Sequence, residues 1–338
     1  MGVSYLELSG ANLHPEDYVS VIVSEENIKY KNLENYLNEG GTVIGGADML
    51  SKVLKTEARN NYIKYFLPSA SIQNLPPCDI YKSCFVPADA NSFPNQENMN
   101  TWKEFDSGKG RVIMLPSGIA SLMNDRRIKR KNFYSACSRK EMNERVSAVS
   151  KGSIYHYLQR ALENLFHFRN LPFISLWPFP DGRQNIFGFR IDTDFADLDD
   201  LQSLYSVCRE NNIKASWFVE TGSSGDKINF YKKLENQEIG LHCNRHKVFR
   251  SYKKNYENIS QGLKRLKKID IRPAGFAAPY GEFNNAIGKV INDMDFVYSS
   301  EFGFAYDSLP FYPYLDNSYS RTLQIPIHPV SIGRLYWG

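Results

Sequence analysis

From residue 185 to residue 329, short apolar runs alternate with longer segments in which apolar residues recur every three or four positions. The short runs are typical of buried strands, and the longer segments are typical of helices with one buried face. Strands that alternate with helices form a parallel sheet, because each helix returns the chain to the edge where the strand began. This part of the chain is therefore predicted to be an α/β domain. The predicted strands are residues 185–192, 214–221, 238–243, 273–280, 296–302 and 323–329, and the predicted helices are residues 197–211, 226–236 and 252–268.

The first 150 residues show a similar but less regular alternation. Apolar runs at residues 17–23, 42–46 and 111–115 predict strands. Residues 74–100 are rich in proline and asparagine and predict a loop. The start of the chain is therefore predicted to be an open α/β domain.

A long helix is predicted over residues 141–169, where apolar residues line one face. The connector that follows it contains three prolines, and proline cannot continue a helix. We place the domain boundary in this connector. The predicted parts are an α/β domain at residues 1–150, a helix and Pro-rich connector at 151–183, and a second domain at 184–338.

The composition narrows the classes of protein that the chain can represent. Its five cysteines are odd in number and widely spaced, which argues against a disulfide framework and against a cysteine zinc site. The net charge of +4 does not suggest a dedicated nucleic-acid binder. No run of eighteen apolar residues and no secretory signal is visible, so we expect a cytoplasmic protein.

Polar residues gather where the predicted strands of the second domain end. In a parallel sheet all these ends open on the same edge, and active sites are built there. Each residue alone has a structural explanation, but four strand ends with such residues indicate a functional site. The residues are Asp192, Asp194, His242, His246, Pro279, Tyr280 and His328.

Two histidines and one aspartate have the pattern of a catalytic metal site. His242, His246 and Asp194 offer two nitrogen ligands and one oxygen ligand, which leaves a position open for water on Zn²⁺. Asp192, two residues before Asp194, can then stay free as a base. The alternatives are two histidines that fall four apart by coincidence, and aspartates that cap the helix at residues 197–211.

Four segments in this order resemble the motifs of the polysaccharide deacetylase family, the NodB-homology carbohydrate esterases. The segments are FRIDTDF, GLHCNRH, GFAAPYGEFN and LQIPIHP, and the resemblance covers about residues 185–330. The resemblance implies a distorted or incomplete (β/α) barrel. It also implies a metal-dependent hydrolase that removes the acetyl group from an N-acetylated sugar and releases acetate.

The resemblance assigns a role to each candidate residue. It makes Asp192 the base and His328 the catalytic acid, and it places Pro279 and Tyr280 in the substrate groove, where the backbone N–H of Tyr280 stabilises the oxyanion. The implied ligands of Zn²⁺, or of Co²⁺ or Ni²⁺, are Asp194, His242 and His246. A histidine held between prolines in the core is the alternative for His328.

The third motif departs from the family pattern. Ala277 stands where the family usually has an arginine that orients the base, and Arg190, Arg245 or Arg272 can substitute for it. Cys243 replaces the usual serine or threonine after the first histidine. Two other functions are therefore kept open: a catalytically inactive carbohydrate-binding protein that retains the barrel, and a metal hydrolase that acts on another amide or ester.

The expected substrate is an N-acetylated sugar, a glycan, or a nucleotide-linked or lipid-linked sugar of bacterial O-antigen or capsule biosynthesis. The basic run at residues 125–131 is either a solvated surface segment or a contact with a phosphate-bearing sugar carrier or with an anionic inner membrane. Residues 1–150 weakly resemble class I glutamine amidotransferases. They lack the GxCxG nucleophile elbow, so this domain is predicted to be non-catalytic.

Overall fold

The computed structural model describes residues 6, 12–23, 30–67, 78–88, 98–100, 102–134, 140–329 and 331. Contacts divide the chain into two compact units, and each unit is drawn from two stretches of sequence. The first unit consists of Met1–Asp125 with Ala148–Pro178, and the second consists of Arg126–Ser147 with Phe179–Gly338. The predicted boundaries at residues 150 and 183 differ from this division, because residues 126–147 pack with the second unit and residues 151–168 with the first.

The first unit is built on a four-stranded sheet of order β1-β2-β7-β6, in which β6 is antiparallel to its neighbour. A second sheet has the order β4-β3-β5. The strands of the first sheet are β1 (Ser20–Val23), β2 (Thr42–Gly46), β7 (Gly110–Leu115) and β6 (Lys103–Ser107). Those of the second are β3 (Ala58–Leu67), β4 (Cys78–Pro87) and β5 (Asn98–Asn100), and the helices are α1 (Tyr30–Asn38), α2 (Ala47–Leu54), η1 (Ala120–Asn124) and α3 (Lys151–Phe168).

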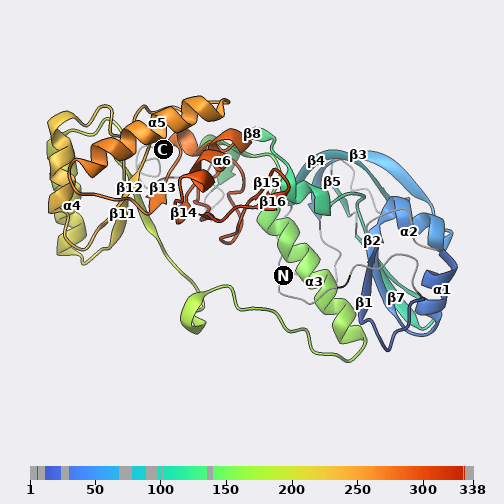
Figure 1. Cartoon of the computed structure of the whole chain (residues 1–338). Coiled ribbons are helices and arrows are strands. Elements are labelled where there is room, and N and C mark those ends of the chain that lie inside the picture. Colours follow the sequence, from blue (N-terminus) through green and yellow to red (C-terminus); the bar gives the residue numbers. More distant parts are fainter. Residues whose placement is uncertain are drawn as a thin grey trace. The chain divides into compact units, whose positions relative to one another are not determined.

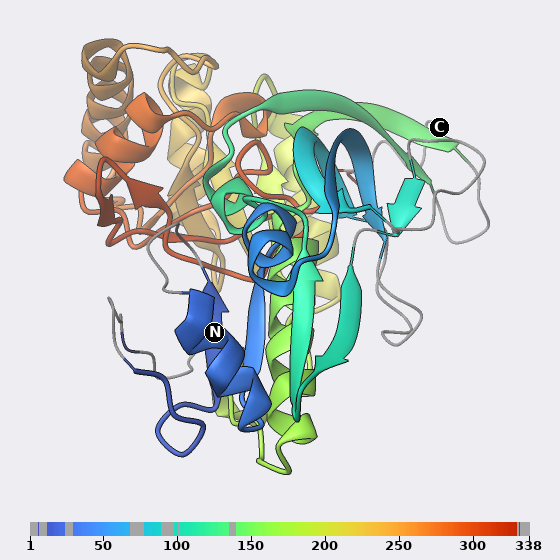
Figure 2. The same cartoon turned by 90° about the vertical axis from the view of Figure 1, so that its right-hand side faces the viewer.

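Alternate residues of the strands explain how this sheet is covered. Val43 and Val112 pack in a cluster with residues of α1 and α2, whereas Ile44 and Ile113 pack in a cluster with residues of α3. Successive strand residues point to opposite faces, so the sheet is buried on both sides. Figure 2 shows α3, in yellow-green, running along this sheet.

Two sequence predictions for this half of the chain are wrong. Residues 74–100, predicted to be a loop, contain the strands β4 and β5. Residues 141–147 are not the start of a helix, because β9 (Lys140–Ser147) pairs with β8 (Ile128–Tyr134) and α3 begins only at Lys151. Tertiary strand pairing therefore overrides the helical spacing in this segment.

The second unit contains a six-stranded sheet in which every pairing is parallel. Its order, β10-β11-β12-β13-β14-β17, follows the order of the chain. Such a sheet is wound in one direction only, and among the described residues β17 does not pair with β10. The predicted α/β class with an incomplete (β/α) barrel is thus confirmed. Figure 1 shows β11 to β14 in a row, with α4 and α5 beside them.

The elements of the second unit lie close to their predicted positions, but the later strands are short. The strands are β10 (Phe189–Asp192), β11 (Ala215–Val219), β12 (Glu238–Leu241), β13 (Gly275–Phe276), β14 (Tyr298–Ser299) and β17 (Leu323–Gln324), with a hairpin of β15 (Tyr314–Leu315) and β16 (Ser318–Tyr319). The helices are η2 (Pro180–Gly182), α4 (Leu198–Glu210), η3 (Gly225–Lys233), α5 (Tyr252–Lys267), η4 (Pro279–Gly281) and α6 (Asn285–Asp293). The helix predicted at 226–236 is a 3-10 helix, η3.

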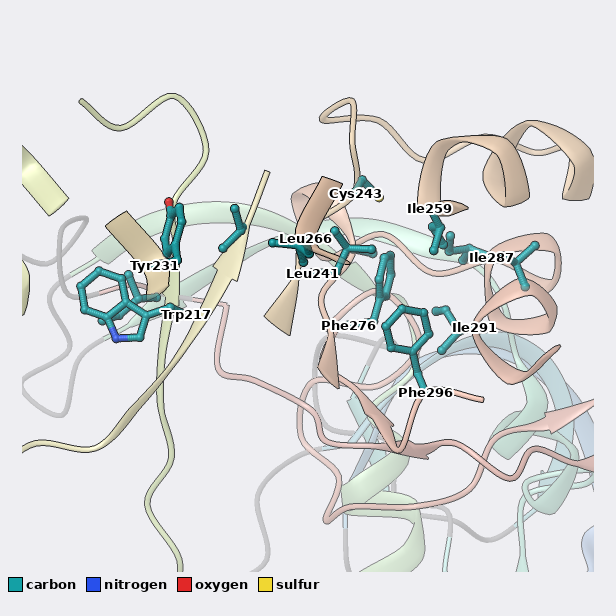
Figure 3. Close-up of a cluster of buried hydrophobic side chains, with 14 of the residues drawn as sticks. Trp217, Tyr231, Leu241, Cys243, Ile259, Leu266, Phe276, Ile287, Ile291 and Phe296 are labelled. Atoms are coloured by element: carbon teal, nitrogen blue, oxygen red, sulfur yellow. The ribbon is translucent and has the colours of Figure 1, made fainter. Parts of the chain in front are cut away.

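One hydrophobic cluster fixes the strands of the second unit against its helices (Figure 3). Trp217 of β11, Leu241 of β12 and Phe276 next to it are fully buried in this cluster. Ile259 of α5 and Ile287 of α6 pack there from the helical side. Because the cluster holds three neighbouring strands in register, it also fixes the positions of the polar residues that follow them. Among the described residues, no helix has the length and the apolar character that crossing a membrane requires.

Candidate active site

The segment after β10 directs two carboxylates away from the core. Thr193 lies between Asp192 and Asp194, and both its backbone N–H and its hydroxyl bond to the carbonyl oxygen of Phe218 at 3.0 Å. The hydroxyl of Tyr231 donates to the Thr193 hydroxyl at 2.8 Å. Since neighbouring residues of an extended segment point in opposite directions, burial of Thr193 leaves both aspartates on the open side.

Asp194, His242 and His246 form one group of potential metal ligands. Oδ1 of Asp194 lies 3.8 Å from Nε2 of His242, and Oδ2 of Asp194 lies 3.5 Å from Nε2 of His246. The two Nε2 atoms are 3.1 Å apart. Ligand atoms around a tetrahedral zinc ion with bonds of about 2.0–2.1 Å lie about 3.3 Å from one another. The three residues therefore have the spacing and the chemistry that a Zn²⁺ ion requires.

His242 is held in the tautomer that a metal ligand needs. Its Nδ1 lies 2.8 Å from the carbonyl oxygen of Ala277, which can only accept a hydrogen bond. The proton therefore sits on Nδ1, and the lone pair of Nε2 points toward Asp194 and His246. Burial lowers the pKa of His242, and this effect outweighs the nearby carboxylates of Asp192 and Asp194. His242 is accordingly neutral near pH 7.

A buried glutamate fixes the peptide group that orients His242. The N–H of the same peptide, at Ala278, donates to Oε1 of Glu301 at 3.2 Å. The other oxygen of Glu301 accepts from the side-chain amide of Gln324 at 2.8 Å. Glu301 is thus linked to His242 through the Ala277–Ala278 peptide, whose carbonyl oxygen faces His242 and whose N–H donates to the carboxyl group of Glu301.

Burial raises the pKa of Glu301 to about 7, although its hydrogen bonds act in the opposite direction. The value in the folded protein exceeds the ordinary 4.5, so the folded state binds a proton more tightly than the unfolded state. The contribution of Glu301 to the unfolding free energy is complete below pH 4.5 and is lost as the pH rises through about 7.

We expect the Glu301→Gln variant to lose this pH dependence. The wild-type protein should lose about 3 kcal/mol relative to the variant between pH 4.5 and 7, at about 1.4 kcal/mol per unit of pKa shift. Urea unfolding of both proteins at several pH values measures the difference. Parallel pH profiles for the two proteins would contradict the prediction.

The loop after β12 brings His246 beside His242. Asn258 of α5 accepts from the backbone N–H of Arg245 at 2.7 Å and donates to the carbonyl oxygens of Arg245 and Lys247. Cys243 has a φ of 67°, a left-handed backbone conformation that residues other than glycine rarely adopt. The turn at Cys243 and the hydrogen bonds of Asn258 together bring His246 back beside His242.

Arg190 contacts Asp192, the predicted base. Its Nε and Nη2 donate to the two carboxylate oxygens of Asp192 at 2.7 and 2.5 Å. Its Nη1 donates to the carbonyl oxygen of Ser300, and its guanidinium group lies 5.2 Å from the centre of the Phe218 ring. Of the three arginines considered as substitutes, Arg190 is the one that contacts Asp192, whereas Arg245 and Arg272 are exposed.

Two opposing effects set the charge of Asp192. Burial acts to raise its pKa, but the charge of Arg190, the neighbouring histidines and the hydrogen bonds from Arg190 outweigh it. The net shift of the pKa is downward. Asp192 is therefore ionised near pH 7 and able to accept a proton.

The turn η4 places Tyr280 against the ligand group. The Tyr280 ring lies 4.5 Å from the ring of His246, and its side chain is 66% exposed. Tyr280 has a φ of 58°, and an outlier of this kind persists only where the surroundings enforce it. Pro279, which opens the turn, is buried. Tyr280 and the exposed Phe195, whose ring is 5.5 Å from that of His246, therefore flank the cluster.

His328, the predicted catalytic acid, lies beside the β8–β9 hairpin. It is exposed, and its ring lies 5.8 Å from that of Phe133 in β8. This described contact is with the β8–β9 hairpin and not with the Asp–His cluster. The structure therefore brings together the predicted base and the three predicted ligands, with Tyr280 beside them, and places His328 near the hairpin. The roles of all these residues stay predictions.

Sequence reasoning missed Glu301 and the β8–β9 hairpin. Glu301 offered one signal, because it is an acidic residue within the apolar run 296–302. The hairpin offered none, because its partners in the second unit, such as Glu282 and Phe302, lie far later in the chain.

Residues 194–299 match the family model described as polysaccharide deacetylase. The matched residues lie within the second unit and include the segments GLHCNRH and GFAAPYGEFN. The resemblance predicted from four motifs is thus confirmed for the region that holds the ligand cluster. We call the unit of residues 126–147 and 179–338 the deacetylase-like domain. None of the comparisons bears on the predicted amidotransferase resemblance of residues 1–150, which stays a prediction.

Similar solved structures include a protein from Mycobacterium smegmatis assigned as a polysaccharide deacetylase, with 20% identity over 47% of this chain and 62% of that chain and a TM-score of 0.37. A family 4 carbohydrate esterase from Streptomyces lividans in complex with acetate has 15% identity over 45% of this chain and 83% of that chain, with a TM-score of 0.33. A CE4 family pseudoenzyme from Bacillus anthracis, BA3943, has 14% identity over 62% of this chain and 81% of that chain, with a TM-score of 0.34. The chain spans less than two thirds of the Mycobacterium smegmatis protein. No curated protein matches the chain.

Proposed function

We propose that the deacetylase-like domain is a metal-dependent hydrolase that removes the acetyl group from an N-acetylated sugar and releases acetate. One observation carries the proposal: an ionised aspartate held by an arginine stands beside three residues with metal-ligand spacing. Asp192 and Asp194 are two residues apart on one segment, so the base and the ligand cluster share the same edge of the sheet.

Asp194, His242 and His246 would hold the metal ion. Two imidazoles and one carboxylate suit Zn²⁺, and imidazole also suits Co²⁺ and Ni²⁺. A bound Zn²⁺ ion supplies two functions, lowering the pKa of water to about 7 and polarising a carbonyl group.

Asp192 would take the proton from the water that attacks the acetyl carbonyl carbon. Each of its oxygens accepts one hydrogen bond from Arg190 and keeps a further lone pair for this proton. Arg190 fixes the direction of those lone pairs. The backbone N–H of Tyr280 is proposed to stabilise the oxyanion, next to the histidine ligand that its ring contacts.

His328 is proposed to protonate the leaving amine, because an amine is a poor leaving group without a proton donor. Its exposure keeps it accessible to a substrate. The ring of His328 contacts Phe133. A lower kcat of acetate release in a His328→Gln variant would support the role of His328 as the acid.

Two other functions compete with this proposal. A catalytically inactive carbohydrate-binding protein was suggested by Ala277, but the bidentate contact of Arg190 with Asp192 supplies the missing arginine from another strand. A metal hydrolase acting on a different amide or ester would use the same residues. For the sugar, we propose an O-antigen or capsule precursor, nucleotide-linked or lipid-linked. We propose the cytoplasm as the location, with residues 125–131 as the candidate contact with the inner membrane.

Removal of the metal should abolish acetate release. We expect purified protein to contain close to one equivalent of Zn²⁺, Co²⁺ or Ni²⁺ per chain, because three ligands converge on one point. Dialysis against a chelator should stop acetate release from an N-acetylated sugar, and added Zn²⁺ should restore it. Elemental analysis and an acetate assay measure both effects. Full activity in metal-free protein would refute the proposal.

Substitution of Arg190 should reduce catalysis without loss of metal. We expect the Arg190→Lys variant to lower kcat by about 10- to 100-fold, because lysine cannot hold both oxygens of Asp192 and partners of this kind contribute effects of that size. Metal content should stay unchanged. Arg321→Lys is the matched control, since Arg321 forms an exposed ion pair with Asp295 in the same domain. An unchanged kcat in Arg190→Lys would exclude a positioning role.

A further inference from the structure

The β8–β9 hairpin packs one side against the rest of the deacetylase-like domain. The guanidinium group of Arg126, at the start of the hairpin segment, lies 4.0 Å from the centre of the Phe304 ring, and Nη2 of Arg126 donates to the carbonyl oxygen of Tyr314 at 2.7 Å. Nζ of Lys131 donates to the Tyr306 hydroxyl at 3.3 Å. Part of the basic run at residues 125–131 therefore anchors the hairpin and is not a solvated segment.

Two arginines face each other across the hairpin. Arg130 of β8 pairs in register with Arg145 of β9, and both side chains are exposed. Side chains directly opposite in an antiparallel pair have Cβ atoms about 4.5–5.5 Å apart, and like charges there are destabilising. The next pair along the hairpin is Asn132 with Asn143, also exposed. The Arg130–Arg145 pair therefore lowers stability in the free protein. An anion bound between the two guanidinium groups would remove this repulsion.

The arginine pair lies near the candidate active site. A carboxylate oxygen of Glu282 lies 4.0 Å from Nη1 of Arg145. Glu282 follows Tyr280 by two residues, a stretch of chain that spans at most about 7 Å, and the Tyr280 ring contacts His246. Both side chains of the Arg145–Glu282 pair are more than one third exposed, so this ion pair is weak and leaves Arg145 able to turn to another anion.

We propose that Arg130 and Arg145 bind a phosphoryl group carried by the substrate, so that the substrate class is an N-acetylated sugar phosphate. This substrate class rests on the proposed function, which accounts for the acetyl group. The arginine pair accounts for the phosphoryl group. Arginine holds phosphate through paired N–H donors, and two arginines together match the charge of a phosphate monoester or diphosphate. Asn132 and Asn143 offer amide donors and acceptors beside the pair for sugar hydroxyls.

Binding measurements test the proposal independently of catalysis. The dissociation constants of N-acetylglucosamine 1-phosphate and of N-acetylglucosamine are measured by calorimetry in the full chain and in the Arg130→Ala/Arg145→Ala variant. We expect the wild type to bind the phosphate ester more tightly, and the variant to lose about 10- to 100-fold of that affinity. The affinity for the neutral sugar should not change. Arg321→Ala is the control, because Arg321 is an exposed arginine of the same domain that pairs with Asp295.

Thermal unfolding provides a second measurement. The double variant should have the same Tm as the wild type or a slightly higher one, because a like-charge pair is removed. The phosphate ester should raise the Tm of the wild type and not that of the variant.

Three results would overturn the proposal. One is equal wild-type affinity for the two sugars, and another is the same loss of affinity for both in the double variant. The third is arginine-dependent binding to vesicles that contain phosphatidylglycerol without any arginine-dependent binding of the sugar phosphate. Failure of the proposed function would look different, since the protein would prefer the phosphate ester and yet release no acetate from either sugar.

Discussion

Replacement of Asp192 by asparagine is expected to lower the kcat of acetate release by about 10²- to 10⁴-fold, the range that a positioned general base contributes. Asparagine has nearly the same shape but cannot accept a proton from water at neutral pH. Arg190 would keep its contact with Ser300 and with the face of Phe218. Folding and metal content should therefore be preserved. Steady-state kinetics and elemental analysis of the purified variant measure the two quantities.

Asp199→Asn is the matched control for this experiment. Asp199 lies in the first turn of α4 and is exposed, and the cap of that helix is provided by Asp197. The control should keep the kcat of the wild type. If Asp192→Asn were equally active, the base would have to be another residue, even though its carboxylate is the one that Arg190 holds.

The His242→Ala variant should lose the metal ion as well as the activity. His242 is the most buried of the three proposed ligands and is held by the Ala277 carbonyl oxygen, so its removal should leave the site without a fixed ligand. We expect metal affinity to fall by more than about 100-fold, beyond the effect of losing an outer partner. Equilibrium dialysis against Zn²⁺ measures the affinity.

His167→Ala, in α3, is the control for histidine removal, because His167 is exposed and lies in the first unit. It should bind metal as tightly as the wild type. Retention of one equivalent of metal by His242→Ala, with a dissociation constant close to that of the wild type, would refute the ligand assignment. His246→Ala should resemble His242→Ala, since the two Nε2 atoms approach the same point.

Local sequence patterns predicted the parts of the site that lie close together in the chain. Asp192 ends one strand and Asp194 follows it, and His242 and His246 follow another strand, so strand alternation and spacing were enough to bring them to one edge. The contact of Arg190 with Asp192 was one of three open alternatives, because Arg245 and Arg272 lie far from Asp192 in the chain and only the fold decides whether they approach it. Here the choice follows from position, since residues two apart on β10 point to the same face.

Other features depend on contacts that no local pattern encodes. Glu301 acts on His242 through the Ala277–Ala278 peptide, which requires β12, β13 and the end of β14 to be in register. The packing of β8 and β9 with the second unit is equally nonlocal. The apolar residues at 141–169 had helical spacing, but the first part of this segment, to Ser147, forms β9 and pairs with β8.

The order of synthesis has a consequence for how the deacetylase-like domain is completed. Its hairpin leaves the ribosome with the first unit, while the residues that the hairpin packs against, from Phe302 to Tyr314, come more than 150 residues later. Contacts of such long sequence separation form slowly, because the loop between them must close first. A gene fragment that begins at residue 184 would encode the whole ligand cluster but leave the hairpin's binding surface bare. Any attempt to produce this domain alone should therefore add residues 126–147, either fused in a new order or supplied as a separate chain.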